Sequence, residues 1–370
     1  MKIAVITSFW KPPRFRGGIS RVMFELRKRW INGGHTVHVY APDAVGNRAG
    51  GIFRMYVPPL PLRSVWLNAR IALAGGLKDY DVVFPQTGIM ALFMNRKKCI
   101  PFIHTLSRVE HPSRWRVWRR AFAPLERYAL KNLPLYITFF GDANQGLMTD
   151  YGIPATKIRL VNNGVDDDVF RPGDAPACEA FIVLSAGRFI PRKRFDLLIK
   201  SFALFAGRCK NAKLVIAGDG NLNVRLKHLA SKLGIASKVS FPGMVDEGMM
   251  LKLYQSASVY VLPSVAEGMP MVALEAQSCG LPVIAGDFAF TRAVVLDEKT
   301  GLLVRGDDPV QWAEALGRIY ENTRLRRTLG MAGREHVIKS FTWDQTADRI
   351  MTGFERVLKE SMSSNLPGNS

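Results

Sequence analysis

Two carboxylates stand out in an otherwise apolar segment, residues 266–277 (AEGMPMVALEAQ), where Glu267 and Glu275 lie eight residues apart. Carboxylates accept hydrogen bonds from hydroxyl groups, so a sugar is a fitting partner for such a pair. Taken alone, either glutamate has a simpler explanation, as an acid that complements a helix dipole or as a solvated side chain.

The local sequence places these two glutamates on different elements. The run VYVLP (259–263) predicts a strand, Gly268 permits a sharp loop, and Pro270 suits the first turn of a helix. The first glutamate then precedes the helix and the second lies within it. Free N–H groups of the first turn, at about 269–272, would face an anion.

A pair of cations forms a second candidate site. Arg188 comes directly after the predicted strand FIVLSAG (181–187), and Lys193 follows five residues later, ahead of an amphipathic helix. An arginine can donate to two oxygens at once and a lysine supplies a compact charge, which together suit a pyrophosphate. Arg192 and Arg194 are expected to face water.

A glycine pair, Gly17 and Gly18, follows the first predicted strand and precedes a helix. Without side chains there, backbone N–H groups could approach a phosphate closely. The pair is not part of a G-x-G-x-x-G fingerprint, and a simple turn explains a glycine pair equally well.

The elements that would position these residues alternate between short apolar strands and amphipathic helices. A strand at 2–10, a helix at 19–34 and a strand at 35–42 form a first βαβ unit. Further strands are expected at 80–86, 100–106, 135–140 and 157–165, with a long helix at 113–132. This pattern predicts a parallel sheet covered by helices.

A second series of the same kind follows the segment RPGDAPACE (171–179), which suits a linker. We therefore predict an α/β protein with two doubly wound, Rossmann-like domains that face a cleft. The expected limits are 1–172, 173–342, a C-terminal helix at 343–360 that packs back on the first domain, and a tail at 361–370. Ligands of such sheets bind beyond the carboxyl ends of the strands. The expected elements of the second series are strands at 181–187, 212–220, 238–243, 259–263, 282–286 and 301–304, and helices at 195–209, 222–233, 247–256 and 270–278.

The chain is strongly basic, with a net charge of +20, and the charge is uneven. Residues 1–173 hold 26 Lys and Arg against 11 Asp and Glu, whereas residues 174–370 hold 25 against 20. The first half is thus expected to meet nucleic acid, a phosphorylated substrate or an acidic membrane surface. Four scattered cysteines predict neither a disulfide framework nor a zinc site. No apolar stretch reaches spanning length, so a cytoplasmic protein is expected.

Taken together, these motifs resemble the retaining nucleotide-sugar glycosyltransferases of family four, which have the GT-B fold. The two cations, AGDG (217–220), FPGMV (241–245) and PSVAEGMPMVALEAQSCGLPVIA (263–285) carry the resemblance. It extends to GGISR near the start, LERYAL (125–130), YGIPATKIRLVNNGVDDDVF (151–170) and FTWDQTADRI (341–350), which together span nearly the whole chain.

The resemblance implies a role for each matching position. Glu275 would hold the ribose hydroxyls of the donor, and Glu267 would contact the transferred sugar. Arg188 and Lys193 would neutralise the pyrophosphate, and His104 would lie near the reaction centre. Without the resemblance, His104 is as readily a hydrogen-bonded loop histidine. Backbone groups complete the expected donor site at Gly17, Gly18, Val245, Gly268, Met271 and Val272.

Cleavage of the bond between sugar and phosphate leaves extra charge on the nucleotide diphosphate, which these cations would stabilise. The resemblance implies retained anomeric configuration and no bound metal or other cofactor. An acceptor hydroxyl is the nucleophile, and no dedicated general base is apparent. UDP is the preferred donor nucleotide, with GDP, as in GDP-mannose, the alternative.

A region rich in tryptophan and arginine could meet the acceptor. Within 113–132, Trp115 and Trp118 share one helical face, with Arg114 and Arg119 among the flanking arginines. A core-facing helix with solvated arginines is the usual explanation. An interfacial helix on anionic lipid is the other, and it would suit a lipid-linked acceptor at the inner face of the membrane.

Other classes of protein fit less well. A nucleotide-sugar epimerase or a phosphorylase could share the architecture, but the spacing of the two glutamates disfavours both. A dinucleotide-dependent oxidoreductase would need a full glycine fingerprint. A basic nucleic-acid-binding protein would show a known binding module, and none is recognisable. The sequence therefore predicts a glycosyltransferase of polysaccharide, lipopolysaccharide or glycolipid assembly.

Overall fold

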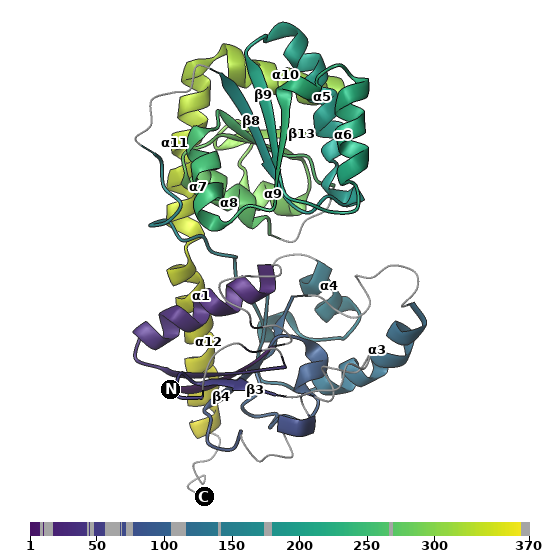
Figure 1. Ribbon diagram of the computed structural model, residues 1–370. Helices are drawn as coiled ribbons and strands as arrows, with labels where there is room; N and C mark the ends of the chain where they lie inside the picture. Colours follow the sequence, from purple (N-terminus) through teal and green to yellow (C-terminus); the bar gives the residue numbers. More distant parts are fainter. Residues whose placement is uncertain are drawn as a thin grey trace, which may run out of the picture. The chain divides into compact units, whose positions relative to one another are not determined.

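The computed structural model describes residues 1–7, 10, 18–42, 44, 48–55, 67, 69–71, 77–104, 116–139, 142–173, 180–265 and 269–363. The side chains of 18, 19, 116–122, 142, 143 and 290 lie outside this description. The chain divides into two compact units (Figure 1). Unit 1 comprises Met1–Asn163 and Trp343–Ser370, and unit 2 comprises Gly164–Thr342. The domain limit predicted at 172/173 falls within unit 2.

Unit 2 is built on a six-stranded sheet in which every neighbouring pair is parallel. The order β10-β9-β8-β11-β12-β13 reverses direction between β8 and β11, which is the switch point where ligands of such sheets bind. The strands are β8 (Phe181–Ala186), β9 (Ala212–Ala217), β10 (Val239–Gly243), β11 (Val259–Leu262), β12 (Val283–Gly286) and β13 (Gly301–Val304).

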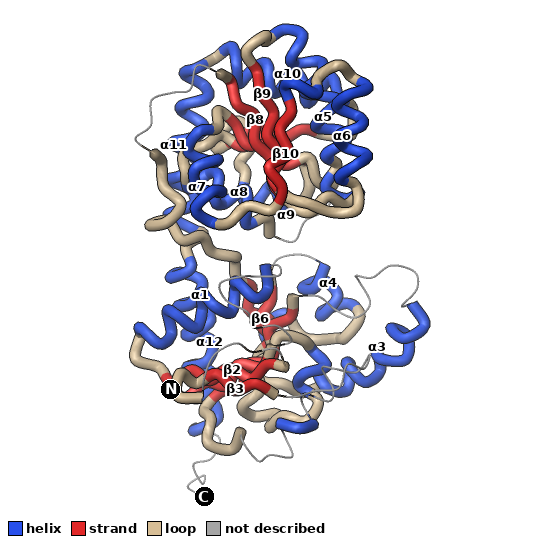
Figure 2. Tube along the Cα trace, in the orientation of Figure 1, coloured by secondary structure: helices blue, strands red, loops and turns tan. Residues whose placement is uncertain are grey.

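Helices cover both faces of this sheet, so successive strand residues enter different cores. Val183 and Val261 belong to the core beneath one group of helices, whereas Leu184 and Tyr260 belong to the core on the opposite face. The first group is α5 (Phe195–Arg208), α6 (Asn223–Lys232) and α10 (Pro309–Glu321), and the second includes α7 (Glu247–Ser256), α8 (Met271–Ser278) and α11 (Thr323–Ser340) (Figures 1 and 2). Short α9 (Ala289–Val294) follows β12.

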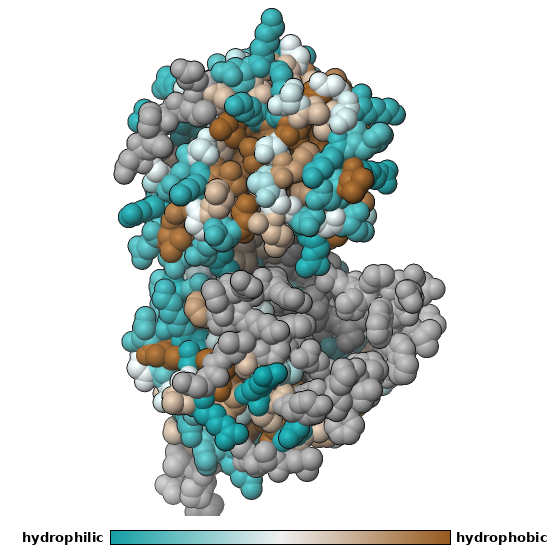
Figure 3. Space-filling view, in the orientation of Figure 1, coloured by the Kyte–Doolittle hydropathy of each residue, from teal (hydrophilic) through white to brown (hydrophobic). Residues whose placement is uncertain are grey.

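The edge strand β10 is only half covered. Val239 and Phe241 are half-buried, and Met244 just beyond the strand is 80% exposed. Figure 3 shows hydrophobic atoms over this edge of the sheet between largely hydrophilic flanks. Pro242 lacks a backbone donor and the register shifts between Ser240 and Gly243, so the edge is a poor template for a further strand.

Unit 1 contains a four-stranded parallel sheet, β3-β2-β1-β4, and a three-stranded one, β5-β6-β7. A bridge between Val83 and Cys99 links the two sheets just before β5. The strands are β1 (Lys2–Ile6), β2 (Thr36–Ala41), β3 (Ile52–Arg54), β4 (Val82–Pro85), β5 (Phe102–Ile103), β6 (Tyr136–Thr138) and β7 (Ile158–Leu160). The described helices that precede unit 2 are α1 (Gly18–Asn32), α3 (Arg116–Leu130) and α4 (Asp142–Thr149).

The last helix, α12 (Trp343–Ser363), packs on α1 within unit 1 although it follows unit 2 in the chain (Figure 1). Phe354 is fully buried, with its ring centroid 5.6 Å from that of Trp30 and 5.2 Å from that of Phe84. Arg29 of α1 also donates to Asp344 at 2.8 Å. The aromatic contacts complete one of the cores of unit 1.

Two further features bear on the sequence predictions. Within the described part of the chain, no helix combines the length and apolar character that a membrane crossing requires. Cys99, Cys209 and Cys279 are buried with free thiols, and Cys178 lies outside the described residues.

Candidate functional site

The loop after β8 carries both predicted cations. Arg188 is exposed. Lys193 is the last residue of a short 3₁₀ turn, Pro191–Lys193, in the same loop. A Cβ atom built on Gly187 would lie 3.6 Å from Lys193 Nζ, so the ammonium group folds back over the backbone that precedes Arg188. Both charges therefore lie at the carboxyl end of β8, beside the switch point.

Close backbone contacts join this loop to its neighbours. Gly187 N–H donates to Ala217 O at 2.9 Å, and Gly218 N–H donates to Gly243 O at 2.8 Å. A Cβ on Gly218 would come within 2.0 Å of Gly187 O, and its φ of +133° also favours glycine. The loops that follow β8, β9 and β10 are thereby held side by side.

The loop between β11 and α8 lies against the same turn, because Val265 N–H donates to Arg192 O at 3.1 Å. Pro270 occupies the N-cap of α8 and no side chain caps this end of the helix. Met271 and Val272 are half-buried and begin the helix, so their N–H groups belong to its uncapped first turn. Glu267 and Gly268 lie outside the described residues.

Glu275 lies in the middle of α8 and is 7% exposed. The hydroxyl of Tyr254, on α7, lies 2.9 Å from Glu275 Oε2 and 3.2 Å from Val272 O. Burial and then the neighbouring Glu275 carboxylate raise the pKa of Tyr254 well above its usual value. Tyr254 is thus a neutral hydroxyl that donates to the carboxylate.

Val245 follows β10 and is half-buried at the start of α7. Asp246 caps this helix, since its carboxylate accepts from Met249 N–H at 2.8 Å. The segment predicted to border the base is therefore rigidly joined to the helix that carries Tyr254.

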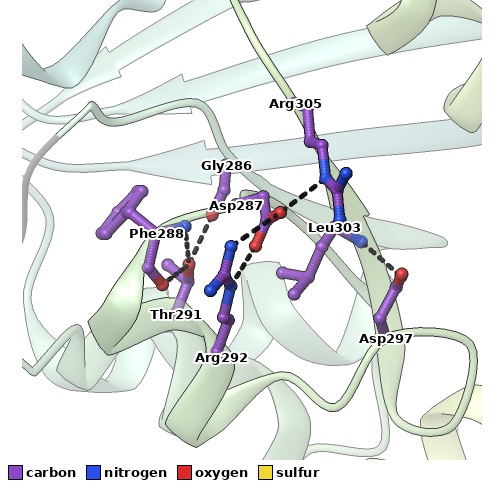
Figure 4. Close-up of polar contacts among 8 residues, drawn as sticks. All are labelled: Gly286, Asp287, Phe288, Thr291, Arg292, Asp297, Leu303 and Arg305. Atoms are coloured by element: carbon purple, nitrogen blue, oxygen red, sulfur yellow. Dashed lines mark hydrogen bonds and ion pairs between the residues drawn. The ribbon is translucent and has the colours of Figure 1, made fainter.

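A charged cluster at the ends of β12 and β13 was not predicted from the sequence. The Asp287 side chain is 6% exposed and accepts from Arg292 Nε at 2.5 Å and Arg305 Nε at 2.9 Å (Figure 4). The two hydrogen bonds from Arg292, and less strongly the one from Arg305, lower the pKa of Asp287 against the opposing effect of burial. Both arginines stay mostly exposed, so the cluster leaves this edge of the sheet positive.

In unit 1, His104 directly follows β5, at the carboxyl edge of its sheet. Its ring packs against Phe102 and Phe139, with centroids 4.2 Å and 5.3 Å away. Nε2 is buried and has no hydrogen-bond partner among the described residues. Burial lowers the pKa of His104 to about 3, so the ring is neutral at neutral pH.

Gly18 begins α1, also at the carboxyl edge of the first sheet, and Gly17 lies outside the described residues. Thr7 and Gln86, which follow β1 and β4, are buried there and hydrogen-bonded to each other. Sequence reasoning missed this polar pair because its members are 79 residues apart. Only the order of the strands places them together.

Arg114 and Trp115 lie outside the described residues, and of Trp118 and Arg119 only the helical backbone of α3 is described. The C-terminal half of α3 carries Tyr128, which is 61% exposed and has the Arg96 guanidinium 5.0 Å from its ring centroid. Phe93, 48% exposed, precedes Arg96 in the same loop. Unit 1 thus presents aromatic and basic side chains to solvent.

A hollow of about 390 Å³ between α5 and α6 contains none of the predicted site residues. Its lining combines leucines with basic groups, and Arg194 there is already paired with Asp307 and Asp196. Among the described residues, no cluster of three or more His, Cys, Asp or Glu side chains is arranged to hold a metal ion.

Comparison with known proteins identifies the family of the chain. Residues 16–169 match the family described as Glycosyltransferase Family 4, and residues 168–336 match Glycosyl transferases group 1. A D-inositol 3-phosphate glycosyltransferase of Acidothermus cellulolyticus is 34% identical over 81% of this chain and 73% of its own length. The chain belongs to glycosyltransferase family 4. A second relative with that name, from Mycolicibacterium paratuberculosis, is 33% identical over 59% of this chain and 52% of its own length.

Solved structures show the same GT-B fold. Sucrose-phosphate synthase from Thermosynechococcus elongatus has a TM-score of 0.79 and 22% identity, with 97% of this chain and 99% of that one covered. Anabaena Alr3699/HepE in complex with UDP and glucose has a TM-score of 0.76 and 19% identity, with 96% and 99% covered. This family 4 chain is therefore a GT-B glycosyltransferase with two Rossmann-like domains.

Proposed function

We propose that the protein transfers a sugar from a UDP-sugar to an acceptor hydroxyl with retention of anomeric configuration. One observation carries the proposal: the loop that holds Arg188 and Lys193 is hydrogen-bonded to the loop that leads into α8. Two cations, an uncapped helix N-terminus and the buried Glu275 thus surround the switch point of one sheet. This combination suits a nucleotide diphosphate.

Catalysis in this proposal depends on charge. The departing diphosphate gains negative charge, and the two cations with the α8 N-terminus lower the energy of that state without a metal ion. Glu275 holds the ribose hydroxyls, and Val245 borders the base. Glu267, His104, Gly17, Gly18 and Gly268 complete the proposed site. UDP is preferred over GDP because Alr3699/HepE was solved with UDP and with UDP-glucose.

Thermal shift measurements with UDP, GDP and ADP test the donor, because a ligand that binds only the folded state raises the melting temperature. A shift confined to UDP and lost in Glu275→Gln supports the proposal. UDP-sugars, assayed with and without EDTA, then identify the sugar and test metal independence. If no nucleotide shifts the melting temperature, the proposed donor site is wrong.

The proposed acceptor is a glycan or lipid-linked sugar at the inner face of the cytoplasmic membrane. The basic first half of the chain, with the exposed Tyr128 and Phe93 and the half-buried Arg96 of unit 1, supports peripheral docking on an anionic membrane surface. Sedimentation with anionic liposomes at low salt, compared with neutral liposomes, tests this point. Equal binding to both, or none, contradicts it.

A phosphorylated cyclitol is the second candidate acceptor, favoured by the name of the relatives, D-inositol 3-phosphate glycosyltransferase. Transfer to inositol phosphate in the absence of membranes would select it. Transfer that requires lipid extract would select the lipid-linked acceptor instead.

A further inference from the structure

Two buried tyrosines lie beneath the proposed donor site of unit 2. Tyr254 and Tyr260 are both fully buried, and their ring centroids are 5.8 Å apart. Tyr254 comes from α7 and Tyr260 from β11, so the two rings join a helix to the central strands of the sheet. A buried tyrosine hydroxyl needs a hydrogen-bond partner, and the partners here differ.

Tyr254 donates to the Glu275 carboxylate, whereas the hydroxyl of Tyr260 is hydrogen-bonded to the main chain of Ala186. Ala186 N–H donates to Tyr260 Oη at 3.1 Å, and Tyr260 Oη lies 3.3 Å from Ala186 O. Ala186 is the last residue of β8, two positions before Arg188. One tyrosine thus contacts the acidic part of the proposed site and the other contacts the strand that leads to its cations.

The position of Tyr254 is fixed by its surroundings. Its ring makes an edge contact with Phe170 at a centroid distance of 5.9 Å, in addition to the contact with Tyr260. Its helix begins at the Asp246 cap, directly after Val245. The Tyr254 hydroxyl is therefore held in one place. A hydrogen bond from this hydroxyl favours the one rotamer of Glu275 whose carboxylate reaches it.

We infer that Tyr254 is a positioning residue that holds the Glu275 carboxylate ready for the ribose hydroxyls of the donor. The inference rests on the proposed function, since it assigns Tyr254 a part in the same site. Without this hydrogen bond the Glu275 carboxylate would be held less firmly in the orientation that accepts from vicinal hydroxyls, and the donor would bind less tightly. A tyrosine that served packing alone would affect every ligand of the site equally.

The test compares UDP with 2′,3′-dideoxy-UDP, which lacks the ribose hydroxyls, by isothermal titration calorimetry. Tyr254→Phe removes one oxygen and keeps the ring. Its affinity for UDP should fall by roughly tenfold, because a carboxylate that lacks this charge-assisted hydrogen bond has to be ordered when the ribose binds. Its affinity for 2′,3′-dideoxy-UDP should change little. The preference for UDP over the dideoxy nucleotide should therefore fall from the wild-type value toward the value for Glu275→Gln. In turnover, the KM for the donor should rise more than kcat falls.

Tyr260→Phe is the matched control, because it removes a neighbouring buried hydroxyl that contacts the main chain. It should retain the wild-type preference for UDP over the dideoxy nucleotide, even if both bind more weakly. Both affinities are measured on the same preparation of each variant, so partial unfolding cannot change the ratio between them.

Either of two results with the variants overturns the inference. Tyr254→Phe could keep the full preference for UDP, or Tyr260→Phe could lose it to the same extent. In both cases wild-type protein still binds UDP and the proposed function stands. If the wild type binds UDP and its dideoxy analogue equally well, Glu275 does not contact the ribose and the inference fails with that assignment. Failure of the wild type to bind any nucleotide contradicts the proposed function itself.

Discussion

At the scale of single residues, Arg188 and Lys193 show how a short turn concentrates charge. Lys193 lies over Gly187, immediately before Arg188, because the 3₁₀ turn reverses the chain. Glycine at 187 leaves room for the lysine stem. In the proposed function, two cations on one strand-end loop stabilise a diphosphate more strongly as its negative charge increases.

We predict that Arg188→Ala and Lys193→Ala each lower kcat, with a loss of about 2–4 kcal/mol of transition-state stabilisation. The reason is that both charges act mainly on the leaving group. Steady-state kinetics with the identified donor and acceptor measures the effect. Arg192→Ala, on the same turn and expected to face water, is the control and should change kcat little. Unchanged turnover in both of the first two variants would remove them from the catalytic machinery.

His104 carries the pH prediction. Its pKa of about 3 in the folded protein lies below the usual value of 6.5, so the unfolded chain binds more protons between these limits. Its contribution to stability is therefore present above pH 6.5 and is lost as the pH falls toward 3. Urea denaturation at a series of pH values should show that the free energy of unfolding falls more steeply with acidification in the wild type than in His104→Gln. If the free energy of unfolding depends on pH in the same way in both proteins, the His104 ring is not held neutral in the fold.

At the scale of elements, the strand-end loops of unit 2 act as one layer because backbone contacts join them. At Gly218 the loop after β9 lies so near the loop after β8 that Gly187 O leaves no space for a side chain. A displacement of this loop would move the residues that carry the two cations. The order of the sheet alone does not secure the site, since the loops also have to approach one another.

Gly218→Ala should destabilise unit 2 by roughly 1–3 kcal/mol and weaken UDP binding, because the strained φ and the close contact both oppose it. Chemical denaturation and calorimetry measure the two effects. Gly207→Ala on α5 is the control, because a Cβ there meets nothing within 4 Å, and helix propensity predicts a gain of up to about 1 kcal/mol. Equal stability of the two variants would show that the loop adjusts freely.

Much of the strand and helix pattern of unit 2 could be predicted from periodicity, since α7 and β13 have the predicted bounds. The short β3 was missed, because three residues carry too little pattern to detect. Tyr254 was missed as a partner of Glu275 because 21 residues separate them and an apolar helix face explains a buried tyrosine. The sequence also held no sign of the Asp287 cluster, which depends on β12 and β13 being neighbours.

At the scale of the whole molecule, unit 1 is made from two separate parts of the chain. Its first part ends at Asn163, and α12 joins it after all of unit 2. The contact of Phe354 with Trp30 and Phe84 is apolar and fully buried, so α12 is part of the core and not a surface addition.

Phe354→Ala should destabilise unit 1 by about 3–5 kcal/mol, the usual effect of removing a buried phenylalanine ring. Hydrogen exchange should accelerate within residues 1–163 and 343–363, while residues 164–342 remain protected. Phe202→Ala is the matched control, since Phe202 is equally buried in unit 2. It should give the reverse pattern. Uniform acceleration in both variants would show that the two units unfold together.

The late position of α12 also orders events during synthesis on the ribosome. Unit 1 is the first to emerge, yet it cannot close its aromatic core until α12 has been translated. Unit 2 is contiguous and can fold as soon as its own residues are free. The part of the protein that is made first is therefore completed last, and a chaperone that shields exposed Trp30 and Phe84 would act on it throughout the interval.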